Sequence, residues 1–287
     1  MLPTVPRGCD LGNIYRRQVR AGVSTAYGDL GRPPLRAGAL RHALVTGGLW
    51  TDVQVLASTA STNAVAAQAA RTGAAEGLVV VAEAQTAGRG RLDRAWVSPP
   101  RAGLTVSVLL RPQVADTGQW GWLPLLTGTA VVTALRAHAG LSAAQLKWPN
   151  DVVVGGAKLG GILAEVPVPG AVVVGLGLNI TTSRAELPID RPATSLAIEG
   201  ATTTDRDTVL RAVLRALAAA YDGWHLDPDG TRADYRAACG TLGSQVRVEL
   251  PSGDLVDGTA TDVDDTGALV VAGRALSAGD VVHLRDA

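Results

Sequence analysis

The sequence predicts an α/β (α+β) fold: a mixed, largely antiparallel sheet with packed helices, followed by a small C-terminal β-barrel. Three observations predict it. Short runs rich in Val and Leu alternate with helical patterns between residues 40 and 112, as in a sheet covered by helices. Further strand-like runs lie close together between residues 145 and 180, where they can pair as antiparallel neighbours. After Cys239 the strands become short and are separated by Gly-containing turns, which is typical of a small barrel.

The composition limits the classes of protein to which the chain can belong. Its 287 residues suffice for one large domain or two of ordinary size. Basic and acidic side chains number 26 each, so the excess of positive charge expected of a nucleic-acid-binding protein is absent. There is no apolar run of about 20 residues, no signal-peptide pattern and no cysteine framework. We therefore expect a cytoplasmic protein that binds neither DNA nor membranes.

The first 112 residues are predicted to contain an irregular extension followed by alternating helices and strands. Residues 1–34 are rich in Gly, Pro and Arg, and we expect a mobile extension rather than a helix-turn-helix. Ser61 or Thr62 is the expected N-cap of a helix that Gly73 ends. The segment 84–100 has no period and is expected to be a loop. The predicted elements are a helix near 40–45, a strand at 53–58, a helix at 61–73, and strands at 77–83 and 102–112.

The second half of the chain predicts two long helices, four strands and the barrel. The helix at 119–140 is apolar all round, and the helix at 205–224 is amphipathic with Asp205 as its cap. The strands are expected at 145–148, 151–156, 158–166 and 171–180. We place a domain boundary near residue 239, which divides the chain into an extension (1–34), a main domain (35–238) and a barrel domain (239–287).

The loop GRGRLDRAW at residues 88–96 is the first segment that carries chemistry. Arg89, Arg91 and Arg94 lie within six residues of one another, beside Gly88 and Gly90. Glycine lets the backbone approach a ligand, and arginine donates in pairs to phosphate or carboxylate. A solvated basic hairpin loop is the alternative interpretation. The spacing matches neither a Walker A loop nor a dinucleotide-binding GxGxxG helix start.

The segment KWPNDVVVGGAKLGG holds both lysines of the chain, Lys147 and Lys158, among 26 basic side chains that are otherwise arginine. A lysine kept where arginine is the rule suggests a need for a compact point charge on a thin stem. Pro149 fixes a turn, so Lys147, Asn150 and Asp151 are expected to project from a strand end. Asp151 is a candidate Mg²⁺ or ribose contact. Gly160 and Gly161 are expected to leave room for a flat ligand.

Two weaker signals complete the set. Ser61, Thr62 and Asn63 open a helix, and helix N-termini bind polar ligand groups as well as forming ordinary caps. In GLGLN (175–179), the glycines could serve only close packing, whereas Asn179 inside a buried strand requires a polar partner. The four histidines show no metal-ligand spacing, and no Ser-His-Asp or Cys-His arrangement is visible. A site for phosphate and carboxylate, built from Arg, Lys, Asp and Gly, is what remains.

These segments, in this order, resemble a bacterial biotin–protein ligase in the form that lacks an N-terminal DNA-binding domain. The resemblance runs from about residue 50 to the C-terminus and rests on STN (61–63), EAQTAGRGRLDRAW (83–96), KWPND (147–151), KLGGILAE (158–165), GLGLN (175–179) and VVHLR (281–285). It implies a class II synthetase-like biotin/lipoate ligase catalytic domain at 35–238 and an SH3-like barrel at 239–287. Residues 1–34 depart from the repressor members of the family, because they are too short and irregular for a winged helix-turn-helix.

The resemblance also implies an activity and its residues. Biotin's carboxylate attacks the α-phosphate of MgATP, and a lysine of a biotin carboxyl carrier domain then displaces AMP. Lys158, Arg91 and Arg89 are the expected catalytic residues, with Asp151 as the Mg²⁺ contact. The expected biotin-binding residues are Ser61, Thr62, Asn63, Gln85, Arg89, Gly90, Arg91, Lys158 and Gly161. The expected ATP-binding residues are Arg94, Trp96, Lys147, Asn150, Asn179 and Arg285.

The expected partner is the carrier domain of acyl-CoA or pyruvate carboxylases, and the expected state is a monomer or weak homodimer. Two alternatives stay open. A lipoate–protein ligase uses the same adenylate chemistry but should lack the GRGR loop and the KWPND segment. A catalytically silent biotin-sensing regulator should have lost Lys158 or the arginines, and both are intact.

Overall fold

The computed structural model describes residues 31–92, 94–113 and 116–284. The chain divides into two units, Met1–Pro33 and Pro34–Ala287, and the fold described below is that of the second unit. Most of the extension predicted at residues 1–34 lies outside the described residues, as does Arg285.

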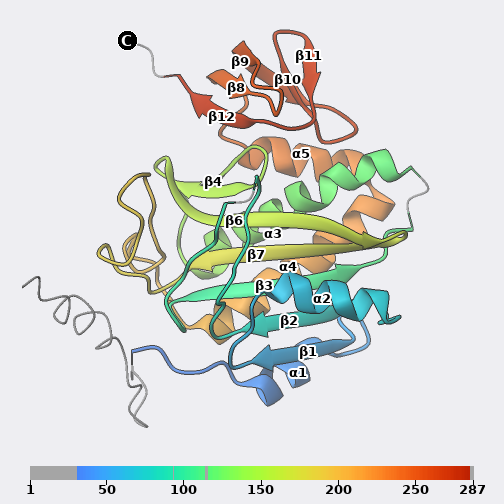
Figure 1. Cartoon of the computed structure of the whole chain (residues 1–287), viewed down its shortest axis with the longest axis vertical. Helices are drawn as coiled ribbons and strands as arrows, with labels where there is room; N and C mark the ends of the chain where they lie inside the picture. Colours follow the sequence, from blue (N-terminus) through green and yellow to red (C-terminus); the bar gives the residue numbers. More distant parts are fainter. Residues whose placement is uncertain (1–30, 93, 114–115, 285–287) are drawn as a thin grey trace, which may run out of the picture. The chain divides into compact units, whose positions relative to one another are not determined.

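A seven-stranded sheet in the order β1-β2-β3-β7-β6-β5-β4 forms the centre of this unit (Figure 1). Its strands are β1 (Asp52–Leu56), β2 (Leu78–Ala82), β3 (Gly103–Leu110), β4 (Ala144–Lys147), β5 (Asp151–Val154), β6 (Ala157–Val168) and β7 (Ala171–Asn179). β1 and β2 pair in parallel, and the other neighbours in this sheet pair antiparallel. The predicted mixed, largely antiparallel sheet is therefore confirmed.

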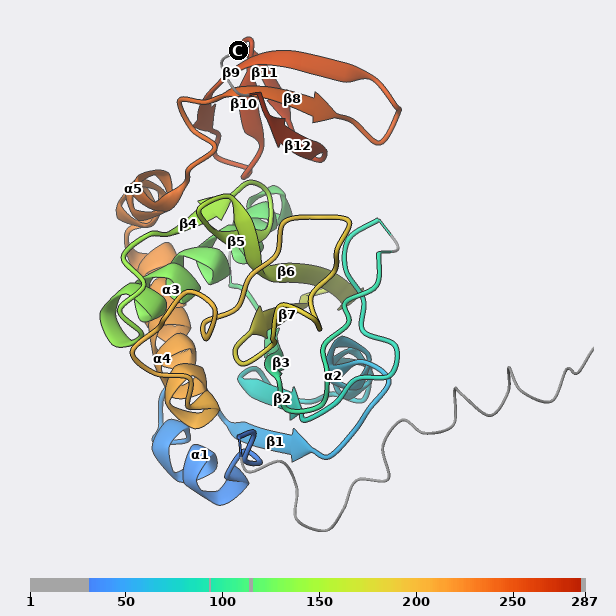
Figure 2. The same cartoon turned by 90° about the vertical axis from the view of Figure 1, so that its left-hand side faces the viewer.

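Helices cover both faces of the sheet (Figure 2). The described helices of this unit are α1 (Ala37–Leu44), α2 (Thr62–Arg71), α3 (Trp122–His138), α4 (Arg206–Leu226) and α5 (Pro228–Ala238), of which α5 packs against α3 and α4. α3 and α4 lie on one face and α2 on the other. The core follows the alternation of the strands, since Val79 and Val81 pack in the cluster with α3 and α4, whereas Leu78 and Val80 pack with α2. Within the described part of the chain, no helix has the length and apolarity to cross a membrane.

The sequence interpretation missed α5. Pro228 occupies its first turn, and the carboxylate of Asp227 accepts a hydrogen bond from the backbone N–H of Gly230. An Asp-Pro pair is a normal helix start, so the signal was present. It was obscured because α5 is short and polar and is separated from the end of α4 by the single residue Asp227.

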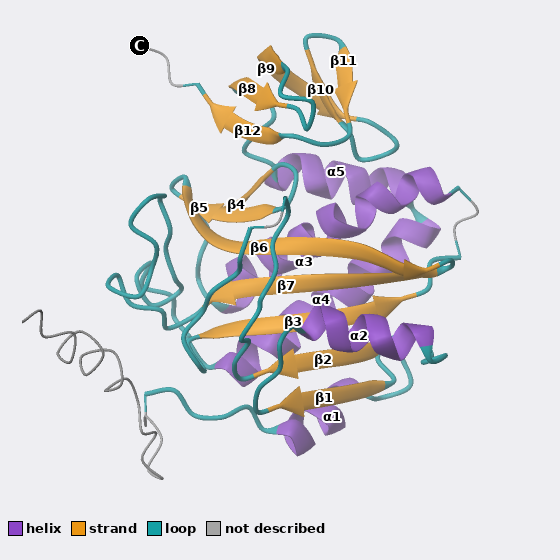
Figure 3. Ribbon diagram, in the orientation of Figure 1, coloured by secondary structure: helices purple, strands orange, loops and turns teal. Residues whose placement is uncertain are grey.

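The C-terminal residues form a five-stranded antiparallel sheet in the order β11-β10-β9-β8-β12 (Figure 3). Its strands are β8 (Gln245–Glu249), β9 (Leu255–Val263), β10 (Leu269–Val271), β11 (Arg274–Leu276) and β12 (Asp280–His283). Buried and exposed residues alternate strictly along β8, because one face of the strand packs inside and the other meets solvent. This is the small C-terminal β-domain expected from the sequence.

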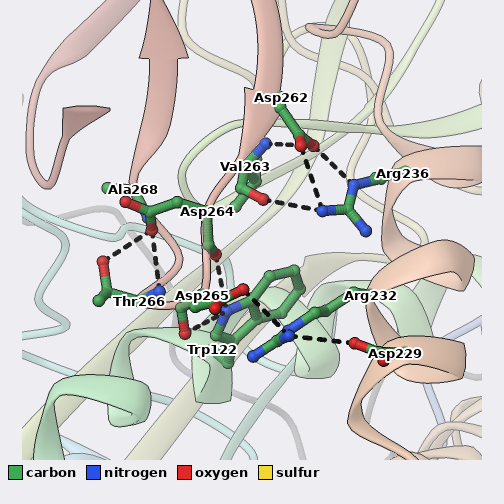
Figure 4. A network of polar contacts seen from close by, with 10 residues as sticks. All are labelled: Trp122, Asp229, Arg232, Arg236, Asp262, Val263, Asp264, Asp265, Thr266 and Ala268. Carbon is green, nitrogen blue, oxygen red and sulfur yellow. Dashed lines mark hydrogen bonds and ion pairs between the residues drawn. The ribbon is translucent and has the colours of Figure 1, made fainter. Parts of the chain in front are cut away.

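Polar contacts between helices and the barrel fix the barrel in place (Figure 4). The indole Nε1 of Trp122, at the start of α3, donates to the backbone oxygens of Asp264 and Asp265 at 3.1 Å each. Arg236 on α5 donates to the carboxylate of Asp262 on β9 at 2.6 Å. These contacts hold the barrel against α3 and α5.

Candidate functional site

The floor of the site is the half of the sheet that α2 leaves uncovered. On β3 and β7, even-numbered side chains pack toward α3 and α4, while Leu109, Ala171 and Val173 pack toward α2. The odd positions 105 and 107 on β3 and 175, 177 and 179 on β7 therefore face the α2 side beyond the helix, and they are small or polar: Thr105, Ser107, Gly175, Gly177 and Asn179. All of these except Ser107 line a cavity of about 600 Å³.

Gly175 and Gly177 make room for two side chains that lie on this floor. A Cβ at Gly175 would lie 2.2 Å from the amide oxygen of Asn63, and a Cβ at Gly177 would lie 2.3 Å from the Trp96 ring. Either contact is far inside van der Waals distance. The glycines of GLGLN therefore serve close packing, as the simpler interpretation of this segment predicted. The side chains that they accommodate, Asn63 and Trp96, belong to the site.

A chain of neutral hydrogen bonds runs under one part of the cavity. The side-chain oxygen of Gln85 accepts from the backbone N–H of Thr62 at 2.7 Å and from its hydroxyl at 3.1 Å. The Ser107 hydroxyl lies 2.7 Å from Thr62 Oγ1 and 2.6 Å from Asn63 Oδ1. Because an amide oxygen only accepts, Ser107 donates to Asn63. Ser61 occupies the predicted N-cap position of α2, but its side chain makes no capping bond, and Gln85 satisfies the helix end instead.

The series of hydrogen bonds ends at a charged group, the carboxylate of Glu165 on β6. Its Oε2 accepts from Asn63 Nδ2 at 2.6 Å and from Arg89 Nη2 at 3.1 Å. One carboxylate thus joins the start of α2 to the arginine loop, which we define as residues 88–96. The loop is braced internally, since the backbone N–H of Gly90 donates to Arg94 O at 2.6 Å and that of Trp96 to Gly88 O at 2.9 Å.

The cations gather around the turn between β4 and β5. Lys158 Nζ lies 2.5 Å from Asp151 Oδ1, and Arg91 donates to Asn150 Oδ1 at 3.3 Å. Arg94 forms an ion pair with Asp280 of β12. Lys147 lies opposite Asp151 in the β4–β5 ladder. Burial lowers the pKa of Arg91, because the charged guanidinium is partly removed from water. A bound anion would offset that cost.

A β-bulge aims Lys158 into the cavity. Along the β5–β6 ladder the register shifts between Val152 and Val153, which pair with Gly160 and Lys158 respectively. Leu159 is consequently buried in the core with α3, while Lys158 turns to the opposite side, toward the site. Bulges commonly redirect a side chain in this way. Periodicity alone would have placed Lys158 on the wrong face.

The structure brings together every described residue to which the resemblance assigns a catalytic, biotin-binding, ATP-binding or Mg²⁺-binding role. Those that line the cavity are Ser61, Thr62, Asn63, Gln85, Arg89, Gly90, Arg91, Arg94, Trp96, Lys147, Asn150, Asp151, Lys158, Gly161 and Asn179. One expectation needs correction. Gly161 leaves room for the Lys158 side chain, 3.2 Å from a would-be Cβ, whereas Gly160 packs against the backbone of Gly177 and is needed for the sheet rather than for a ligand. Asn179 has the polar partner it requires, because its Nδ2 donates to Thr194 O at 2.9 Å.

Sequence reasoning missed several residues of the site. Ser107 and Glu165 complete the hydrogen-bond chain, and Asp280 pairs with the arginine loop. The polar positions 105 and 107 within an otherwise apolar strand were a usable signal for Ser107. Nothing local indicated Asp280, because it reaches the site through the placement of the barrel. The cavity also includes Glu186, Leu187, Pro188 and Arg191 from the loop after β7.

Comparisons of sequence place the chain among known proteins. The model of the biotin/lipoate A/B protein ligase family matches residues 55–179, and that of the biotin protein ligase C-terminal domain matches residues 241–284. A biotin–[acetyl-CoA-carboxylase] ligase of Mycobacterium tuberculosis is 45% identical over 262 residues, which cover 88% of this chain and 97% of that protein. The bifunctional ligase/repressor BirA of Bacillus subtilis is 31% identical over 82% of this chain and 75% of its own length.

Comparison of structures gives the same relationship. The biotin protein ligase from Aquifex aeolicus in complex with biotin and ATP superposes with a TM-score of 0.69 at 27% identity. The superposition covers 83% of this chain and 100% of that chain.

Proposed function

The chain belongs to the biotin protein ligase family, and from this premise we propose that it joins biotin to a lysine of a biotin carboxyl carrier domain at the expense of ATP. The observation that carries the proposal is the composition of one cavity. A neutral hydrogen-bonding network and a group of cations line the same space of about 600 Å³, as a ligand with a polar uncharged ring and a reacting carboxylate beside phosphates requires.

The neutral network is suited to the ureido end of biotin. Ser61, Thr62, Asn63 and Gln85 supply hydroxyl and amide groups, and Gly90 and Gly161 contribute backbone walls. Thr62, Asn63 and Gln85 are held in place by hydrogen bonds to one another or to Ser107, so these three side chains do not have to be ordered when the ligand binds. Such preorganisation favours affinity and selectivity.

The cations are suited to the first chemical step. A carboxylate oxygen of biotin attacks the α-phosphorus of ATP, the new O–P bond forms, and the bond to the leaving pyrophosphate oxygen breaks. Lys158 would lie between carboxylate and α-phosphate, and Arg89 and Arg91 would stabilise the negative charge of the transition state. Adenylyl transfer is mainly positioning and charge neutralisation. Arg94, Trp96, Lys147, Asn150 and Asn179, together with Arg285 outside the described residues, would hold the nucleotide.

Asp151 fits a magnesium ion carried by the nucleotide. Across the described residues there is no group of three or more His, Cys, Asp or Glu side chains that could hold a metal alone. Mg²⁺ that accompanies phosphates needs only one or two carboxylates and keeps several waters. Asp151 lines the cavity beside Lys158. The ion would neutralise phosphate charge there.

In the second step, the amine of the carrier lysine attacks the carbonyl of biotinyl-5′-AMP, AMP leaves with the bonding electrons, and the amine loses a proton. We expect the acceptor to be the carrier domain of an acyl-CoA or pyruvate carboxylase. The reaction belongs in the cytoplasm, and DNA binding is not part of the proposal. We expect the protein to act as a monomer or weak homodimer.

Pyrophosphate release from MgATP by purified protein tests this assignment, with biotin, with lipoate, and with neither. Release that depends on biotin is the expected result. Release with lipoate but not with biotin would be compatible with the fold but would show that the substrate is lipoate. Binding of biotin without release would indicate a sensor rather than an enzyme.

A further inference from the structure

The segment that joins the main domain to the barrel lies along the edge of the main sheet. Residues 239–241, which we call the linker, follow α5 directly. Leu146 and Cys239 form a parallel bridge, and the backbone N–H of Gly240 donates to Leu146 O at 2.9 Å. The linker therefore extends the sheet beyond β4, and it arrives beside the turn formed by residues 148–150, the Trp148 turn.

Thr241 ends the linker with a fully buried hydroxyl. Its Oγ1 accepts from the backbone N–H of Trp148 at 3.1 Å and lies 3.1 Å from Nε2 of His283 on β12. One side chain therefore contacts the turn of the main domain and a strand of the barrel. Neither contact follows from the six short segments that carry the resemblance, because Thr241 lies outside all of them.

Both structures that Thr241 joins carry walls of the cavity. The Trp148 turn lies between Lys147 and Asp151, and β12 contributes Asp280, Val281 and Val282. The Trp148 ring is itself buried, and its Nε1 donates to Gly267 O in the barrel at 3.1 Å. Within the turn, the backbone N–H of Trp148 donates its hydrogen bond to the Thr241 hydroxyl. An N–H buried without a partner is costly, so the turn would shift if this hydroxyl were absent.

We propose that Thr241 is a positioning residue for the nucleotide end of the site: its hydroxyl sets the Trp148 turn against β12 and so fixes the distance between the two walls that hold ATP. The inference rests on the proposed function. The barrel does not depend on Thr241 for attachment, because Trp122 and Arg236 hold it independently (Figure 4). Loss of the hydroxyl should thus alter the site without detaching the domain.

The test compares Thr241→Val, which removes the hydroxyl at nearly constant volume, with Thr241→Ser, which keeps it. Thr127→Val is the matched control, since Thr127 is a buried threonine of α3 whose hydroxyl bonds within its own helix at Leu123 O. Binding of ATP and of biotin is measured separately by calorimetry, alongside KM for each substrate and the melting temperature.

For Thr241→Val we expect ATP affinity to fall and KM for ATP to rise by about tenfold or more, the effect of one unsatisfied buried donor, with biotin affinity within about twofold of wild type. Thr241→Ser should restore ATP binding, and Thr127→Val should leave it unchanged. His283→Ala, at an exposed residue, gives a second variant that does not threaten folding, and it should weaken ATP binding in the same direction.

Unchanged ATP binding in Thr241→Val, or equal losses for ATP and biotin, would overturn the proposal. So would a serine variant as defective as valine. Failure of the proposed function is separately visible, because wild-type protein would then show no biotin-dependent pyrophosphate release whatever the variants do to ATP binding.

Discussion

At the scale of single residues, the surroundings of Lys158 explain why this position keeps a lysine in an arginine-rich chain. Its stem passes so close to Gly161 that a Cβ there would lie 3.3 Å from Cε, and its ammonium group lies 2.5 Å from Asp151. A planar guanidinium is wider than an ammonium group and donates from several nitrogens in a fixed fork. The thin stem and single charge fit the space that the bulge and Gly161 create.

Lys158→Ala should lower the rate of biotin-dependent pyrophosphate release by about 100- to 1000-fold, the usual effect of removing one group that stabilises transition-state charge. Lys158→Arg should be impaired nearly as much, because the charge is restored but the shape is not. Circular dichroism and melting temperature provide the folding control. Near wild-type turnover in Lys158→Ala would remove this residue from the mechanism.

Glu165 should matter for biotin more than for ATP, because it holds Asn63 and Arg89 together. In Glu165→Gln a single amide oxygen replaces a charged acceptor of two donors, and charge-assisted hydrogen bonds contribute about 1.5–3 kcal/mol. We expect biotin affinity to fall by about tenfold in calorimetry and ATP affinity to change little. Glu249→Gln, at an exposed barrel position, is the matched control, and equal effects of the two substitutions would contradict this role.

At the scale of elements, the strands of the sheet could be predicted because each one is an apolar run in the sequence. Their antiparallel pairing could be predicted because several of these runs follow one another closely. The order of helices and strands followed from the sequence, apart from α5. The bulge that reorients Lys158 could not be predicted, because it depends on pairing with β5 rather than on the local pattern. The Gln85 bond to the start of α2 was equally hidden, since the residues lie 23 positions apart.

Gly177→Ala tests whether the floor of β7 is shaped for the Trp96 ring. The added Cβ would overlap the ring, and overpacking of this kind costs about 1–3 kcal/mol. We expect a lower melting temperature together with weaker binding of ATP, because Trp96 is one of the residues proposed to hold the nucleotide; the two are measured by differential scanning fluorimetry and calorimetry. Gly48→Ala is the control, because nothing lies within 4 Å of its Cβ position. Normal ATP binding by Gly177→Ala would show that the Trp96 ring does not depend on this glycine.

At the scale of the whole molecule, the site requires both domains, because Asp280 pairs with the arginine loop and Thr241 with the Trp148 turn. The sequence resemblance anticipated a barrel that contributes to the nucleotide region. The individual contacts of Asp280 and Thr241 could not be predicted from the sequence, because they depend on how the barrel packs on α3 and α5. The boundary near residue 239 stays a prediction, and the linker there is part of the sheet edge rather than a free tether.

The attachment of the barrel should weaken in acid. The hydrogen bond from Arg236 holds the pKa of Asp262 below its ordinary value of 3.8. The stabilisation is therefore present above about pH 4 and lost as the pH falls through the lower folded pKa. Because both side chains are substantially exposed, the pair contributes less than about 1 kcal/mol. Melting temperatures of wild type and Arg236→Gln should differ near neutral pH and converge in acid; a difference independent of pH would contradict this.

Transfer of biotin to a carrier domain is the measurement that tests the account most directly. Purified protein, biotin and MgATP are incubated with a biotin carboxyl carrier domain, and the intact mass of the acceptor is recorded. We predict the addition of one biotin per domain, on a lysine, dependent on ATP and absent with Lys158→Ala. An acceptor of unchanged mass, while biotin and ATP both bind, would show that this cavity does not perform the ligase reaction.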